Sequence, residues 1–289
     1  MVKILVTGAN GQLGSELKKL SGNYPEGEFT FTDVDTLDIT NLASLNIFCA
    51  DKGFQYIVNC AAYTAVDKAE SDSELAEKIN CLSVKNLTSA AKTINAVLVH
   101  ISTDYVFNGK ACQPYMEDQA IDPQSVYGKT KALGEQEALK YGKSVIIRTA
   151  WLYSTFGNNF VKTMLRLGSE RSEINVIYDQ IGTPTYAEDL AKVILSVISH
   201  SNTQGVNPGI YHFSNEGVCS WYDFAWEIMN YSQKKCTVKP IETKDYPLPA
   251  KRPAYSVFNK TKIKNTFHIE IPYWKTSLYK CLDELNNLK

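Results

Sequence analysis

The chain has 289 residues, of which 44% are hydrophobic, so it can bury the core of one large domain and a smaller second lobe. Thirty basic and 31 acidic side chains leave a net charge of −1, which argues against binding to nucleic acid or an anionic membrane surface and favours a small-molecule ligand. The seven cysteines lack the spacing of a metal site or a disulfide framework. Without a signal-peptide pattern or an apolar run of ~20 residues, we expect a cytoplasmic protein.

The first half of the chain alternates between predicted strands and predicted helices. The strands are expected at residues 2–7, 29–33, 56–59, 96–101 and 143–148. The helices are expected at about 15–20, 41–52, 73–94 and 123–140. This alternation predicts an α/β fold, a Rossmann-like doubly wound parallel sheet with helices on both faces.

After residue 150 the alternation becomes irregular. Helices are predicted near 159–170, 186–200 and 220–231, followed by a proline-rich loop at 246–253 and a C-terminal helix. We therefore expect a first domain over 1–150. Residues 151–289 are expected to form mainly a smaller C-terminal α/β lobe for the substrate, with segments that interleave back into the first domain.

A glycine loop joins the first predicted strand to the first predicted helix, in the order Gly8-x-x-Gly11-x-x-Gly14. Glycines permit a tight turn and close approach of a pyrophosphate, and the helix N-terminus offers unpaired N–H groups. The first two glycines stand further apart than in the common fingerprint. Because the loop directly follows a strand, it predicts an NAD(P) site in the domain 1–150.

Residues after the second and third strands extend this prediction. Asp33 lies 19 residues after Gly14, where a carboxylate can accept hydrogen bonds from the ribose of NADH; alternatively, it caps a turn. Asp38 and Ile39 could hold the adenine edge, or Asp38 could simply precede a helix. The small residues within 59–67 would let a nicotinamide ribose approach the backbone, although packing against a helix would select the same residues.

A candidate proton donor lies in the predicted helix 123–140. Tyr127 and Lys131 are four residues apart and would project from one helix face. A neighbouring cation favours the phenolate, so we expect Lys131 to bring the pKa of Tyr127 closer to neutrality, where it can protonate an alkoxide. Tyr231 and Lys235 share this spacing, so the spacing alone is not decisive. Thr103, at the end of the fourth strand, could polarise a carbonyl or cap a turn.

Eight ordered motifs resemble the extended short-chain dehydrogenase/reductases, and within that superfamily the dTDP-4-dehydrorhamnose reductase family. They are GANGQLG at 8–14, CAAYTAVDKAE at 60–70, STDYVF at 102–107, YGKTK at 127–131, RTAWLY at 148–153, GNNF at 157–160, DQIGTPT at 179–185 and KRP at 251–253. The resemblance implies reduction of the 4-keto group of dTDP-4-dehydro-6-deoxy-L-mannose by NADPH or NADH, which yields dTDP-L-rhamnose for polysaccharide biosynthesis.

The resemblance also implies roles for individual residues. Thr103 would polarise the carbonyl, Tyr127 would protonate the alkoxide, and Lys131 would orient the nicotinamide ribose and favour the phenolate. The implied cofactor contacts are Gly8, Gly11, Gln12, Leu13, Gly14, Asp33, Asp38, Ile39, Ala61, Ala62, Tyr63, Tyr127 and Lys131. The implied substrate contacts are Val66, Thr103, Asp104, Tyr127, Trp151 and Arg252. Arg252 would bind the diphosphate, or else form a surface salt bridge.

Members of this family can form homodimers held by Mg²⁺ between carboxylates. Glu16 and Glu188 match that pattern, although both could be ordinary helix acids. Tyr105 stands where related 4,6-dehydratases carry a glutamate, so reduction is favoured over dehydration. Two alternatives are a reductase of another nucleotide-linked 4-keto-6-deoxy sugar and a non-catalytic regulatory subunit of the kind that partners methionine adenosyltransferase. The intact Thr103, Tyr127 and Lys131 argue against the second.

Overall fold

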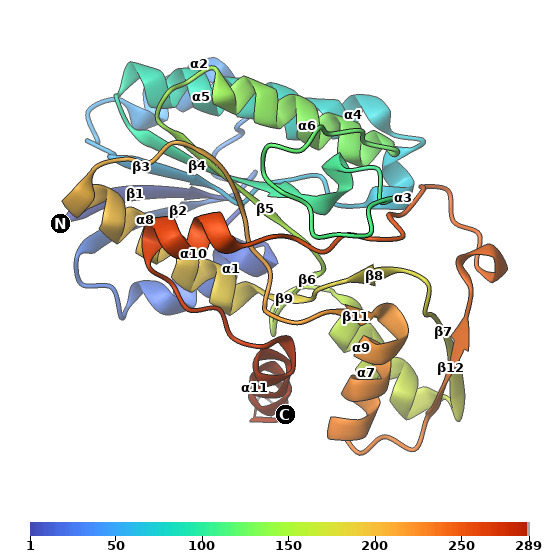
Figure 1. Cartoon of the computed structure of the whole chain (residues 1–289). Coiled ribbons are helices and arrows are strands. Elements are labelled where there is room, and N and C mark those ends of the chain that lie inside the picture. Colours follow the sequence, from blue (N-terminus) through green and yellow to red (C-terminus); the bar gives the residue numbers. More distant parts are fainter. Residues whose placement is uncertain (288–289) are drawn as a thin grey trace.

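A six-stranded sheet with the order β10-β5-β4-β3-β1-β2 forms the centre of the computed structural model, which describes residues 1–287 (Figure 1). Its strands are β1 Val2–Thr7, β2 Gly27–Thr32, β3 Tyr56–Asn59, β4 Val97–Thr103, β5 Ser144–Thr149 and β10 Gly209–His212. All their pairings are parallel. The chain moves outward from β1 to β2 and then returns to β3 on the other side of β1, so the sheet has a switch point where such folds bind their ligands. The predicted Rossmann-like fold is confirmed.

Helices cover both faces of this sheet (Figure 1). One face carries α1 Gln12–Ser21, α8 Ala187–Gln204 and α10 Thr261–Phe267, whose apolar residues share a core cluster with β1, β3, β4 and β5. The other face carries α2 Leu42–Cys49, α5 Ser83–Thr93 and α6 Val126–Leu139. Segments after residue 150 thus return to the sheet, as α8, β10 and α10. The division into two domains stays a prediction.

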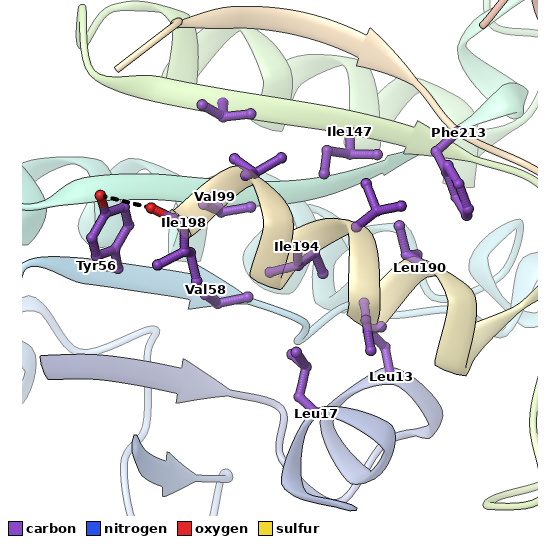
Figure 2. Packing of buried hydrophobic residues seen from close by; sticks show 14 of the residues in the cluster. Leu13, Leu17, Tyr56, Val58, Val99, Ile147, Leu190, Ile194, Ile198 and Phe213 are labelled. Atoms are coloured by element: carbon purple, nitrogen blue, oxygen red, sulfur yellow. Dashed lines mark hydrogen bonds between the residues drawn. The ribbon is translucent and has the colours of Figure 1, made fainter. Parts of the chain in front are cut away.

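The packing of α1 against α8 fixes where the glycine loop lies. Leu13 and Leu17 of α1 meet Leu190 and Ile194 of α8 above the strand residue Val58, as Figure 2 shows. All five side chains are at most 4% exposed. Burial of one such side chain contributes about 1.5–3 kcal/mol, so the N-terminus of α1 is held firmly at the sheet edge.

The other elements after residue 150 form a smaller lobe beside the carboxyl ends of the strands (Figure 1). Its helices are α7 Phe160–Glu170, α9 Trp221–Tyr231 and α11 Trp274–Asn287, which enclose a second core cluster. Its strands pair two by two: β7 Glu173–Ile177 with β12 Thr237–Ile241, β6 Leu152–Tyr153 with β9 Thr185–Tyr186, and β8 Ile181–Gly182 with β11 Cys219–Ser220.

The predicted elements differ from the observed ones mainly within 66–126. The long helix expected at 73–94 consists of α4 Ser73–Glu77, a π-helical turn over Lys78–Leu82 and α5, with the short α3 Val66–Ala69 before it. The helix expected from residue 123 begins instead at Val126, because the Ser125 hydroxyl caps it by accepting the Gly128 N–H at 3.1 Å. Short 3-10 turns occupy Asp104–Val106 and Thr243–Asp245. Among residues 1–287, no helix is both long enough and apolar enough to span a membrane.

Candidate active site

Thr103 lies at the carboxyl end of β4, where β4 pairs with β5 in the register Thr103↔Thr149. Its side chain is buried, donates a hydrogen bond to Asp104 Oδ1 at 3.0 Å and accepts the Tyr105 N–H at 3.2 Å. The alternative that Thr103 caps a turn is therefore true of this structure. Thr103 also lowers the pKa of Tyr127 against the effect of burial, so its hydroxyl belongs to the site as well.

Helix α6 brings Tyr127 and Lys131 to β4. A Cβ atom at Gly128 would collide with the carbonyl oxygen of Tyr105, so the glycine allows the first turn of α6 to approach the end of β4 closely. Lys131 Nζ donates to the carbonyl oxygen of Ile101 in β4 at 2.6 Å. The structure thus brings Thr103, Tyr127 and Lys131 together from two elements.

Burial controls the protonation of this pair. It raises the pKa of Tyr127 to about 12, although the hydrogen bond with Thr103 opposes the shift. The expectation that Lys131 lowers this pKa toward neutrality is wrong, because the ammonium group bonds to the Ile101 carbonyl. Burial also lowers the pKa of Lys131 to about 8, with Glu135 opposing the shift. Tyr127 is consequently a protonated phenol at neutral pH, which is the form of a general acid.

Asp104 is the carboxylate nearest in sequence to Thr103. It is only 3% exposed, and burial raises its pKa to about 6 although the hydrogen bond from Thr103 opposes the shift. Its charge raises the pKa of Tyr127 further. A buried acid that titrates close to neutrality beside a reactive hydroxyl is typical of functional sites.

A cavity of about 270 Å³ opens at the switch point of the sheet. Seven of the residues predicted to bind the cofactor line it: Gly8, Gly11, Asp33, Asp38, Ile39, Ala61 and Ala62. A Cβ atom at Gly8, whose φ is +68°, would lie 2.5 Å from the backbone nitrogen of Ala61. The glycine therefore lets the loop after β1 touch the end of β3, which closes the floor of the cavity.

The two carboxylates in the cavity wall also stabilise turns. Asp33 accepts the backbone N–H groups of Asn10 and Val34, each at 2.8 Å, and so ties the glycine loop to β2. Asp38 accepts the N–H of Thr40 at 2.9 Å and its hydroxyl at 2.7 Å, and these bonds lower the pKa of Asp38. Each of these carboxylates thus stabilises a local turn and also lines the cavity, so the two alternatives left open by the sequence do not exclude each other.

Six other predicted cofactor residues do not line this cavity: Tyr127 and Lys131, described above, and Gln12, Leu13, Gly14 and Tyr63. The Leu13 side chain lies in the core (Figure 2), so only its backbone can face a pyrophosphate. Gln12 accepts a hydrogen bond from Asn159 Nδ2 at 3.0 Å, and Gly14 packs against the carbonyl oxygen of Gly8. The Tyr63 hydroxyl donates to Asp72 at 3.2 Å.

The predicted substrate residues lie in the elements around the catalytic pair. Val66 begins α3, and Trp151 follows β5 with a φ of +50° and its ring stacked on Trp221. Arg252 forms a bidentate pair with Asp67, at 3.1 and 2.9 Å. The salt-bridge alternative for Arg252 is therefore observed, and its contact with a diphosphate stays a prediction.

The predicted magnesium site does not fit its residues. Lys19 lies 2.9 Å from Glu188 and 3.8 Å from Glu16, Lys192 lies 2.7 Å from Glu188, and Lys280 contacts Glu188 as well. Although burial alone would raise the pKa of Glu188, these ammonium groups lower it to about 2. Among residues 1–287, no group of three or more His, Cys, Asp or Glu side chains could hold a metal ion. Lysine side chains already neutralise the carboxylates, so this expectation is corrected.

Several organising polar residues were missed from the sequence. Asn59 ends β3, accepts the Thr7 hydroxyl at 2.8 Å and the Ala61 N–H at 3.1 Å, and contacts His100 at 3.1 Å. Asn80, in the π-helical turn, bonds both backbone groups of Tyr63 at 2.9 and 3.1 Å. A polar residue at the end of an otherwise apolar strand is a signal that could have revealed Asn59, whereas the role of Asn80 depends on tertiary contacts.

Comparison with known proteins agrees with this geometry. The family model described as RmlD substrate binding domain matches residues 2–287. The chain belongs to this family. An RmlD-family relative, dTDP-4-dehydrorhamnose reductase of Aggregatibacter actinomycetemcomitans, is 43% identical over 96% of this chain and 97% of its own. The resemblance drawn from the motifs is thereby confirmed.

Solved structures of the RmlD family agree as well. A dTDP-4-dehydrorhamnose reductase from Clostridium acetobutylicum is 47% identical with a TM-score of 0.93, over 99% of this chain and 100% of that one. The Bacillus anthracis enzyme in complex with NADP is 40% identical with a TM-score of 0.93, over 98% of this chain and 100% of that one.

Proposed function

We propose that this chain is a dTDP-4-dehydrorhamnose reductase, which transfers hydride from NADPH or NADH to the 4-keto carbon of dTDP-4-dehydro-6-deoxy-L-mannose and forms dTDP-L-rhamnose. The observation that carries the proposal is the arrangement of Thr103 at the end of β4 beside Tyr127 and Lys131 of α6, at the sheet edge that also holds the glycine-loop cavity. Reduction of a ketone needs a hydride, a group that polarises the carbonyl and a proton donor, and this edge provides places for all three.

The chain's own residues would divide the work as follows. A bound reduced nicotinamide supplies the hydride. The Thr103 hydroxyl accepts the Tyr105 N–H and donates to Asp104 Oδ1. When the substrate binds, this O–H would turn from Asp104 to the substrate carbonyl oxygen and stabilise the negative charge that develops there. Tyr127 then donates its phenolic proton to the alkoxide, and Lys131, held at the Ile101 carbonyl, would orient the nicotinamide ribose.

Both reduced cofactors belong to the proposal. Asp33 in the cavity wall would accept hydrogen bonds from the ribose hydroxyls of NADH and would repel the 2′-phosphate of NADPH. The NADP in the Bacillus anthracis relative supports NADPH nevertheless. We expect use of both, with the ratio set by Asp33. Cytoplasmic location, assembly into a homodimer and the absence of nucleic-acid binding stay predictions.

Loss of reduced-nicotinamide absorbance tests the function. The wild type should oxidise NADPH and NADH when enzymatically prepared dTDP-4-dehydro-6-deoxy-L-mannose is added, with dTDP-L-rhamnose as the product. A folded protein that binds NADPH but turns over neither cofactor with this sugar would overturn the proposal. Turnover with a different nucleotide-linked 4-keto-6-deoxy sugar would then favour the other reductase, and none at all would favour the regulatory role.

A further inference from the structure

Trp151 has a backbone conformation that bulky residues rarely adopt. Its φ is +50°, in the left-handed region. Such strain persists only where neighbouring groups impose it, and it concentrates at functional sites. Trp151 follows β5 by two residues, and Thr149 at the end of β5 lies opposite Thr103. The strained residue is therefore next to the catalytic edge of the sheet.

Two neighbours clamp the indole ring of Trp151. On one side it stacks on Trp221, with ring centroids 3.6 Å apart and planes inclined by 11°. Gly182 also lies against the ring, where a Cβ atom would lie 2.7 Å from Trp151 Cε2 and 2.8 Å from Cζ2. The Trp151 carbonyl accepts the Thr185 N–H at 3.1 Å. Contacts thus hold both the indole ring and the backbone of Trp151 in place.

The two sides of the clamp are themselves joined. Gly182 in β8 pairs with Cys219 in β11, and β11 runs directly into Trp221, the first residue of α9. Ser220 caps this helix in a reciprocal capping box with Asp223. Phe160 supports Trp221 with its ring centroid 4.7 Å away. The clamp is therefore a hydrogen-bonded unit rather than a chance contact of side chains.

The segment that carries Arg252 is attached to the same unit. The Ile181 N–H donates to the Ala254 carbonyl, and the Ser256 N–H donates to the Ile181 carbonyl, each at 2.8 Å. Strand β8 therefore contacts both Trp151, through Gly182, and the segment after Arg252, through Ile181.

From these contacts we propose that Trp221 is a positioning residue that, with Gly182, fixes the Trp151 indole as a rigid wall of the sugar subsite. This rests on the proposed function, and it gives the DQIGTPT segment at 179–185 a role. A flat aromatic face suits a 6-deoxy sugar, whose methyl group and ring C–H bonds make it less polar than a hexose. A wall held before the substrate arrives spares the cost of ordering it on binding.

The test compares binding of dTDP-L-rhamnose with binding of dTDP, which lacks the sugar. In calorimetry, Trp221→Ala should weaken the binding of dTDP-L-rhamnose by about tenfold or more. The affinities for dTDP and NADPH should stay within about twofold of the wild type. Trp221→Phe keeps an aromatic support and should recover most of the affinity. Gly182→Ala places a Cβ atom against the Trp151 ring, displaces it, and should mimic Trp221→Ala. Trp226→Ala, an exposed tryptophan of the same helix at 48% exposure, is the matched control.

Far-ultraviolet circular dichroism, in the region of the strong indole transition, reports the stack of Trp151 on Trp221 independently of activity. Two stacked indoles should give an exciton couplet that Trp221→Ala and Trp151→Ala both remove and Trp226→Ala keeps. Loss of the couplet in a folded Trp221→Ala protein that binds dTDP-L-rhamnose normally would overturn the positioning role. A wild type that binds dTDP-L-rhamnose no better than dTDP would overturn the sugar wall. A wild type that binds it with the expected preference but lacks turnover would count against the proposed function alone.

Discussion

The region proposed for the cofactor and the region proposed for the sugar are built in different ways. The cavity for the cofactor is made largely by backbone of consecutive segments between Gly8 and Ala62, with small residues that allow close approach. The sugar region collects Trp151, Gly182, Trp221 and Arg252 from four distant segments and depends on stacking, ion pairing and one strained residue. The first region should tolerate little added volume, whereas the second should depend on specific side chains.

The backbone-built region should break most completely at Gly8. Gly8→Ala adds a Cβ atom 2.5 Å from the Ala61 nitrogen and imposes a left-handed conformation that costs an alanine about 1–2 kcal/mol. We expect NADPH binding to weaken by about 10²-fold in a fluorescence titration. Gly22→Ala is the matched control, because a Cβ atom there meets nothing within 4 Å. Equal NADPH affinity in both variants would show that backbone packing does not shape this region.

The catalytic edge should instead show a pH dependence set by one side chain. The pKa of Lys131 is lowered to about 8, so the ammonium form is lost above that pH. We expect kcat/KM, which reports the free enzyme, to fall about tenfold per pH unit above this value. Lys131→Arg keeps its charge and should lose this basic limb, although its absolute rate is lower. A limb that persists in Lys131→Arg would assign the titration to another group.

Asp104 should make the protein less stable as the pH rises from about 4 to about 6. Its pKa is raised from the usual 3.8 to about 6, so the folded state binds a proton that the unfolded state has already released. The loss across this window is about 3 kcal/mol at most. Urea unfolding measures this loss: the free energy of unfolding is determined for the wild type and for Asp104→Asn at several pH values, and the difference between the two proteins should change with pH. A difference in unfolding free energy that stays constant from pH 4 to pH 7 would contradict a raised pKa of Asp104 in the folded state.

The smallest effect is expected where α1, α8 and α11 meet. Chelation by EDTA should change the melting temperature by less than about 1 °C, because Lys19, Lys192 and Lys280 already neutralise Glu188. Lys19→Met should lower it by about 1–4 °C. A larger fall with EDTA, restored by Mg²⁺, would reinstate the metal site.

The contrast between the two regions also explains what the sequence could predict. The glycine loop, Asp33 and the strands Val2–Thr7 and Tyr56–Asn59 follow from local hydrophobic pattern and spacing, and the structure has them as predicted. Helix spacing marked Tyr127 and Lys131, the strand end marked Thr103, and the resemblance assigned the three to one site; the structure brings them together.

Features that depend on tertiary contacts were not predictable. The pKa of Tyr127 depends on burial by residues distant in sequence, so the helix spacing with Lys131 gave the wrong direction. The stack of Trp151 on Trp221 joins residues 70 positions apart, and no local pattern marks it. The lysines around Glu188 come from three helices, which is why matching carboxylates alone suggested a metal.

The central claim is that Tyr127 supplies the proton. Steady-state turnover of dTDP-4-dehydro-6-deoxy-L-mannose by Tyr127→Phe tests it, with Tyr231→Phe as control because Tyr231 and Lys235 share the same spacing on an unrelated surface. We predict that kcat falls by about 10²–10⁴-fold in Tyr127→Phe and that Tyr231→Phe matches the wild type. A Tyr127→Phe enzyme that keeps more than about a tenth of the wild-type kcat would contradict the account.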